Sequence, residues 1–137
     1  IDIVTCLSVL EHIGFDNQIY NNSREKVKNL SINSNLYIDG ILEINRVLKS
    51  NGVAYLSFPF GKSISFNNLR QFDSKDLDRM IKAFKPSSYS TKFYKYFDKE
   101  KNWKQVSEKA CKNCIPIYTD RKVAISSNSV ALLTLYK

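Results

Sequence analysis

The sequence predicts an α/β fold in which strands and amphipathic helices alternate. Ile3–Leu7 is a short continuous apolar run, which is typical of a strand covered on both faces in a parallel sheet. A helix-spaced apolar pattern covers residues 36–48, and a second strand-like run covers residues 53–58. Two such strands joined through a helix can form a site at their ends.

The first helix is predicted from apolar residues that recur four, three and four positions apart, with Val47 beside them: Tyr37, Ile41, Ile44 and Leu48. Ser34 or Asn35 can cap its start. The preceding residues 15–35 are polar and Asn-rich, which predicts a loop with a short helical turn at residues 23–30. Loops of this length in compact domains are usually functional.

Pro59 ends the second strand, because proline cannot donate to the strand ladder. A second helix should begin at Asp73 or Ser74, since apolar side chains follow at helical spacing: Leu77, Met80, Ile81 and Phe84. Aromatic residues alternate with lysine over residues 89–98 and predict a strand with one solvated face. A short helix is expected from Trp103, Val106 and Ala110, and a final strand over residues 130–136.

Composition indicates a globular chain of one domain, because 43% of its 137 residues are hydrophobic. No apolar stretch is long enough to span a membrane. The three cysteines are too few for a disulfide scaffold, so we expect a cytoplasmic protein. Residues 71–137 carry fourteen basic and seven acidic side chains, against seven and six in residues 1–70. A solvated basic surface is the favoured interpretation, and nucleic acid, an anionic membrane or an acidic substrate are the alternative partners.

Two segments resemble those of class I S-adenosylmethionine-dependent methyltransferases. The first is Ser-Val-Leu-Glu-His at residues 8–12, after a strand that begins near Asp2. The second is Arg-Val-Leu-Lys-Ser-Asn-Gly at residues 46–52, where the family usually has Pro and Gly in place of Ser50 and Asn51. Asn tolerates a left-handed backbone, so the turn stays plausible. The resemblance covers about residues 1–84 well, and its specificity comes from the order and spacing of both segments.

The resemblance implies a Rossmann-like sheet, mostly parallel with a final antiparallel strand, and S-adenosylmethionine as cofactor. Members of the family bind the cofactor largely through a Gly-rich turn and a later acidic residue. None of the four glycines here lies in a Gly-x-Gly pair. We therefore expect residues 1–137 to be the C-terminal part of a single methyltransferase domain, inactive alone. By resemblance, the acceptor is the oxygen or nitrogen of a small molecule, such as a sugar or glycan precursor.

By the same resemblance, His12 and Glu11 face the acceptor as catalytic residues. Those implied to contact the cofactor are Cys6, Leu7, Ser8 and Val9, and those implied to shape the substrate pocket are Phe60 and Arg70. The alternatives are structural. His12 and Glu11 can be a packing residue and a turn cap, whereas Cys6 and Leu7 can belong to the core. For Arg70 we favour a surface ion pair.

Two further patterns carry weaker signals. Cys111 and Cys114 have the spacing of half a zinc site or a redox pair, but no second ligand pair accompanies them, so we predict incidental thiols and no metal. The alternating aromatic and lysine residues 89–104 are also compatible with stacking on single-stranded nucleic acid. The second functional hypothesis is therefore a basic, non-catalytic RNA-binding or scaffold domain with a methyltransferase-like sheet.

Overall fold

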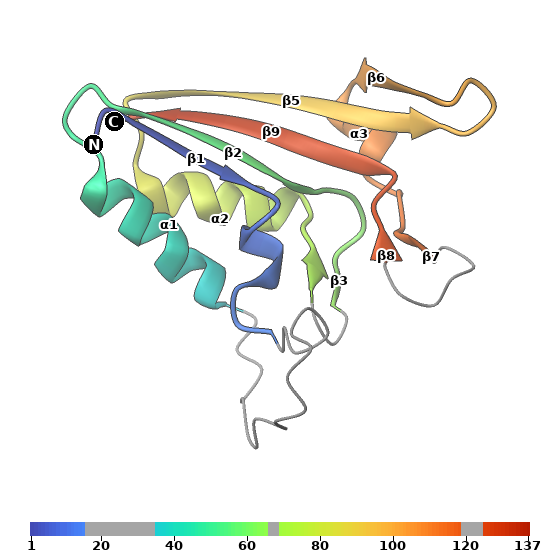
Figure 1. Cartoon of the computed structure of the whole chain (residues 1–137), viewed down its shortest axis with the longest axis horizontal. Coiled ribbons are helices and arrows are strands. Elements are labelled where there is room, and N and C mark those ends of the chain that lie inside the picture. Colours follow the sequence, from blue (N-terminus) through green and yellow to red (C-terminus); the bar gives the residue numbers. More distant parts are fainter. Residues whose placement is uncertain (16–34, 66–68, 119–124) are drawn as a thin grey trace.

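A computed structural model describes residues 1–15, 35–65, 69–118 and 125–137. The loop and helical turn predicted within residues 15–35 fall almost wholly outside the described residues. The fold is α/β, with the main helices on one side of a five-stranded sheet (Figure 1). The sheet has the spatial order β1 (Ile3–Leu7), β2 (Val53–Pro59), β9 (Ser129–Tyr136), β5 (Ser88–Phe97) and β6 (Asn102–Val106).

Strand directions differ from the expected mostly parallel sheet. Among the five described strands of this sheet, β1 and β2 pair in parallel, whereas β9 is antiparallel to both β2 and β5, and β6 is antiparallel to β5. The mostly parallel prediction is therefore wrong. The antiparallel final strand is confirmed, and it lies between β2 and β5 rather than at an edge. Apolar runs report burial but not direction, which depends on the connections between strands.

Two helices cover one face of the sheet. α1 (Leu36–Val47) and α2 (Ser74–Phe84) contact each other and bury the predicted apolar faces against β1, β2 and β9. Asp73 is the N-cap of α2, which confirms the predicted start of this helix, and it forms a capping box with Asp76. Asn35 occupies the cap position of α1, but its side chain accepts a hydrogen bond from Arg79 instead of capping the helix.

The short segments complete the described chain: η1 (Leu10–His12), a 3₁₀ turn, β3 (Ile64–Ser65), β4 (Arg70–Gln71), α3 (Glu108–Cys111), β7 (Ile117–Tyr118) and β8 (Ile125–Ser126). The helix predicted from Trp103 and Val106 is wrong for those residues, because both lie in β6 and only Ala110 lies in α3. At the turn before β2, Asn51 has a φ of 64°, which confirms the left-handed backbone expected there.

The other face of the sheet is solvent-exposed, which corrects the expectation that the first strand is covered on both faces. Val4 and Cys6 of β1 turn towards the helices, whereas Ile3 and Leu7 are 58% and 59% exposed. The core therefore lies between the sheet and helices α1 and α2. Its largest fully buried side chains include Tyr37, Phe58, Phe60, Phe72 and Phe84.

Candidate functional site

Ser8, Glu11 and His12 line one pocket of about 210 Å³. It lies where β1 and β2 end, at the carboxyl edge of the parallel strand pair. In open α/β sheets, ligands bind outside the carboxyl ends of the strands. The other lining residues are Pro59, Leu69, Pro116, Ser127 and Val130. The structure therefore brings together three of the residues that the sequence singles out.

Ser8 has a left-handed backbone, with a φ of 52°. Its N–H donates to the Ser57 carbonyl oxygen at 3.0 Å, so the chain leaves β1 while still paired to β2. Residues other than glycine rarely adopt positive φ, and such conformations cluster at functional sites. This turn lets η1 begin directly after the strand, so Glu11 and His12 lie beside the strand ends.

The Glu11 side chain is buried within the site, with 3% of its surface exposed. Among the described residues, its Oε2 atom has no hydrogen-bond partner. Burial raises the pKa of Glu11, and hydrogen bonds from its own backbone and from Ser8, together with the nearby His12, oppose that rise. A buried carboxylate with an unused oxygen is suited to a ligand that brings a donor or a positive charge.

His12 ends η1 and is partly exposed at the pocket. Its backbone N–H donates to the Val9 carbonyl oxygen at 3.0 Å, and its carbonyl oxygen accepts from the Phe15 N–H at 3.2 Å. These two bonds fix the backbone of the turn. His12 consequently lies next to Glu11 in a short, closed segment of chain, near enough to influence its carboxyl group.

The other residues expected to contact cofactor do not line this pocket. Cys6 turns towards the helices, and burial, followed by the nearby Glu11, raises the pKa of its thiol. Leu7 lies on the opposite sheet face, where it lines a separate hollow. Val9 is 48% exposed and is not among the residues that line the pocket. Of the four, only Ser8 shares the pocket with Glu11 and His12.

Phe60 and Arg70 are both buried rather than exposed at a ligand surface. Phe60 is fully buried, and its ring centroid lies 4.8 Å from that of Phe93. The expected surface ion pair of Arg70 is instead a buried one, with Nη2 3.1 Å from Oδ2 of Asp76. The guanidinium also lies over the Tyr37 ring, 4.7 Å from its centroid. The pocket is lined instead by the residues that precede them, Pro59 before Phe60 and Leu69 before Arg70.

Ser127 and Val130 are pocket residues that the sequence analysis missed. They lie just before and within β9, which runs antiparallel to β2. The start of an antiparallel strand lies at the same edge as the end of its neighbour. The expected antiparallel direction of the final strand could therefore have predicted that these two residues lie at the pocket. Leu69 and Pro116 carry no comparable signal, because nothing local indicates which sheet edge they approach.

Cys111 and Cys114 are free, buried thiols. Burial, followed by the nearby Cys114, raises the pKa of Cys111. Within the described ranges, no group of three or more His, Cys, Asp or Glu side chains is arranged to hold a metal ion. None of the described helices has the length and apolar character needed to cross a membrane.

Comparison of the chain with models of known protein families gives no match, and comparison with curated proteins gives none either.

Proposed function

We propose that this chain forms the acceptor-facing part of an S-adenosylmethionine-dependent methyltransferase that acts on the oxygen or nitrogen of a small molecule. The observation that carries this proposal is the meeting of Ser8, Glu11 and His12 in one pocket at the carboxyl edge of β1 and β2. The antiparallel final strand, which the sequence resemblance implies, is consistent with it.

The pocket suits the reacting end of a ligand rather than a whole cofactor. Its volume of about 210 Å³ is below the range of roughly 300–1,000 Å³ that is usual for ligand sites. The unused Oε2 of buried Glu11 fits a positively charged or hydrogen-donating group. When bound, S-adenosylmethionine supplies a methyl group on a sulfonium, which is already activated for transfer. Ser8 and Glu11 are the residues that would hold its methyl-bearing end.

The chain's own groups can orient and deprotonate an acceptor. Ser8 hydrogen-bonds to Glu11, whose second oxygen is available to accept a bond from a donor group of the acceptor next to the reacting one. In this scheme, the reacting O–H or N–H would donate to a ring nitrogen of His12, and the neutral imidazole would take the proton that the acceptor loses. Positioning would supply much of the remaining acceleration, if the pocket holds the acceptor next to the methyl-bearing end of the cofactor.

The proposal is tested by titrating S-adenosylhomocysteine into the ¹⁵N-labelled chain. We expect weak binding, in the millimolar range, because the chain lacks a Gly-x-Gly cofactor turn. The amide shifts should be largest at residues 8–12 and at Ser57, which is bonded to Ser8. Shifts confined to another surface, or none at all, would count against the proposal. Micromolar binding would show that the chain itself holds the whole cofactor.

A second candidate function, binding of single-stranded RNA, is favoured by the β5–β6 hairpin. Trp103 is 43% exposed, and its ring centroid lies 5.5 Å from that of Tyr96. Lys95 and Lys104 lie over the Phe97 ring. Exposed aromatics beside lysines can stack on bases and neutralise phosphates. Salt-dependent gel retardation of RNA that Trp103→Ala weakens would support this function, and retardation insensitive to salt would oppose it.

A further inference from the structure

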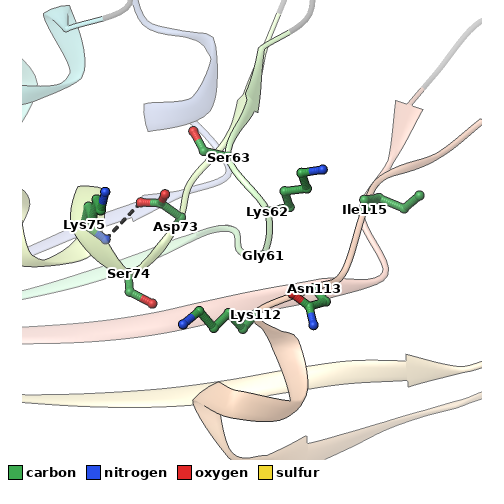
Figure 2. Close-up of a pocket in the computed structure, with 9 residues that line it drawn as sticks. All are labelled: Gly61, Lys62, Ser63, Asp73, Ser74, Lys75, Lys112, Asn113 and Ile115. Carbon is green, nitrogen blue, oxygen red and sulfur yellow. Dashed lines mark hydrogen bonds between the residues drawn. The ribbon is translucent and has the colours of Figure 1, made fainter.

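A second cavity, of about 540 Å³, lies between the loop after β2, the start of α2 and the turn after α3 (Figure 2). It is lined by Gly61, Lys62, Ser63, Asp73, Ser74, Lys75, Lys112, Asn113 and Ile115. It shares no lining residue with the pocket of Ser8, Glu11 and His12. The two pockets are therefore lined by different side chains.

Three lysines from separate segments give this cavity a positive charge. Lys62 follows β2, Lys75 lies in the first turn of α2 and Lys112 follows α3. Figure 2 shows Lys112 extending towards Ser74, and Lys62 extending on the side of Ile115. No ion pair within the described ranges involves any of the three.

Asp73, the acidic residue among those that line the cavity, already accepts hydrogen bonds from the start of α2. Its Oδ1 accepts the backbone N–H groups of Lys75 at 2.9 Å and Asp76 at 3.0 Å. The helix start is consequently capped, and the attraction for an anion comes from the lysine side chains. The cavity combines three ammonium groups with one carboxylate, so its lining carries a net positive charge.

The two walls that carry Lys62 and Lys112 are joined by buried Gln71. Gln71 Nε2 donates to the carbonyl oxygens of Lys62 at 3.0 Å and Cys114 at 2.9 Å. The Lys62 N–H also donates to the Cys114 carbonyl oxygen at 2.9 Å. Gly61 permits this close approach, because a Cβ there would lie 2.4 Å from the same oxygen. The backbone frame is therefore fixed before any ligand binds, which lowers the cost of binding.

From this arrangement we infer that the cavity binds the phosphoryl group of a small phosphorylated molecule. Lysine ammonium groups are compact point charges that suit a multiply charged anion, whereas a planar carboxylate is matched better by arginine. The volume falls within the range of small-molecule sites. The lysines come from three separate segments rather than from one strand or helix, which favours a small ligand over an extended nucleic acid strand.

Titration with inorganic pyrophosphate tests this inference. The wild type is compared with a triple variant, Lys62→Gln, Lys75→Gln and Lys112→Gln. The matched control is Lys82→Gln, Lys92→Gln and Lys99→Gln, which removes equal charge from exposed positions elsewhere. Calorimetry should show affinity at least about tenfold weaker in the cavity variant and little changed in the control. In the ¹⁵N-labelled wild type, amide shifts should centre on Gly61, Lys62 and Asn113.

A charge-gain variant gives an independent readout. Asp73→Asn keeps a side-chain oxygen for the helix cap but removes the negative charge from the cavity, so it should tighten pyrophosphate binding. Equal affinity losses in the two triple variants would overturn the inference, because they would indicate general surface charge. Single-stranded RNA that binds through the same three lysines more tightly than pyrophosphate does would also overturn it.

Discussion

Arg70 and Asp76 form an ion pair inside the protein, with 8% and 7% of their side chains exposed. The Tyr37 hydroxyl donates to Asp76 Oδ1 at 2.9 Å. Burial, followed by this bond to Asp76, raises the pKa of Tyr37 to about 12. The cluster connects β4, α1 and α2 just behind the strand ends. It fixes the segment before α2, which includes the pocket residue Leu69.

Replacing Arg70 should therefore cost much stability. Arg70→Met removes the closer and more buried of the two cations beside Asp76 and leaves only Arg79, whose Nη1 lies 3.8 Å from Oδ1. We therefore expect a loss of about 3 kcal/mol in the free energy of unfolding, at the low end of the cost of breaking a buried pair. Arg46→Met is the matched control, since Arg46 pairs with Glu43 on the exposed face of α1 and should matter far less. Urea denaturation measures both variants. Similar decreases in the free energy of unfolding would show that the buried Arg70 pair stabilises the fold no more than the exposed Arg46 pair.

Glu11 should destabilise the folded chain at neutral pH. The pKa of Glu11 is higher in the folded chain than its unfolded value of about 4.3. The protonated side chain therefore favours the folded state fully below that pH, and this stabilisation is lost as the pH rises through the folded pKa. Glu11→Gln should hence stabilise the chain at pH 7.5, and this gain should shrink at pH 4.5. Urea denaturation at both pH values is the measurement.

The control for that variant is Glu43→Gln. The hydrogen bond from Arg46 lowers the pKa of Glu43. The Glu43 carboxylate therefore stabilises the folded chain above the unfolded pKa, and this stabilisation is lost on acidification. The substitution should weaken rather than strengthen the fold at pH 7.5. A Glu11→Gln variant that behaves like Glu43→Gln would contradict a raised pKa at the pocket.

Two glycine substitutions should differ in sign. A Cβ at Gly61 would lie 2.4 Å from the Cys114 carbonyl oxygen and 2.7 Å from Gln71 Nε2, so Gly61→Ala should cost about 1–3 kcal/mol. At Gly40, within α1, the close atom is the movable Ile13 Cδ1 at 2.9 Å, and alanine favours the helix by up to about 1 kcal/mol. Thermal unfolding compares them. Equal decreases in unfolding temperature would show that the side chain of Ile13 yields no more easily to the added Cβ than the backbone of Cys114 does.

The elements predicted best are those whose local pattern and burial agree. Helix α2 follows from the spacing of Leu77 and Phe84 and from the Asp73 cap, both of which survive in the fold. Strand β6 was mistaken for a helix because Trp103 and Val106 lie three residues apart, a spacing that fits either structure over so short a segment. Pairing with β5 in a local hairpin, in which Phe93 lies opposite Val106, decides the outcome.

The site was predictable only where neighbours in sequence are neighbours in space. Ser8, Glu11 and His12 share one turn, so a sequence motif could place them together. The burial of Arg70 depends on Asp76 and on aromatic rings from other elements, which no local pattern reveals. The lysines of the second cavity likewise come from three separate segments and meet only through the fold.

The measurement that tests the central claim most directly compares titrations of the wild type, Glu11→Gln and Glu43→Gln with S-adenosylmethionine, followed by amide chemical shift. The sulfonium of this ligand carries the positive charge that the Glu11 carboxylate is proposed to attract. In the wild type and in Glu43→Gln, we predict shifts centred on residues 8–12, because Glu43 lies on the exposed face of α1. In Glu11→Gln these shifts should largely disappear at the same ligand concentration. Shifts of equal size and location in all three proteins would contradict a ligand site built around the Glu11 carboxylate.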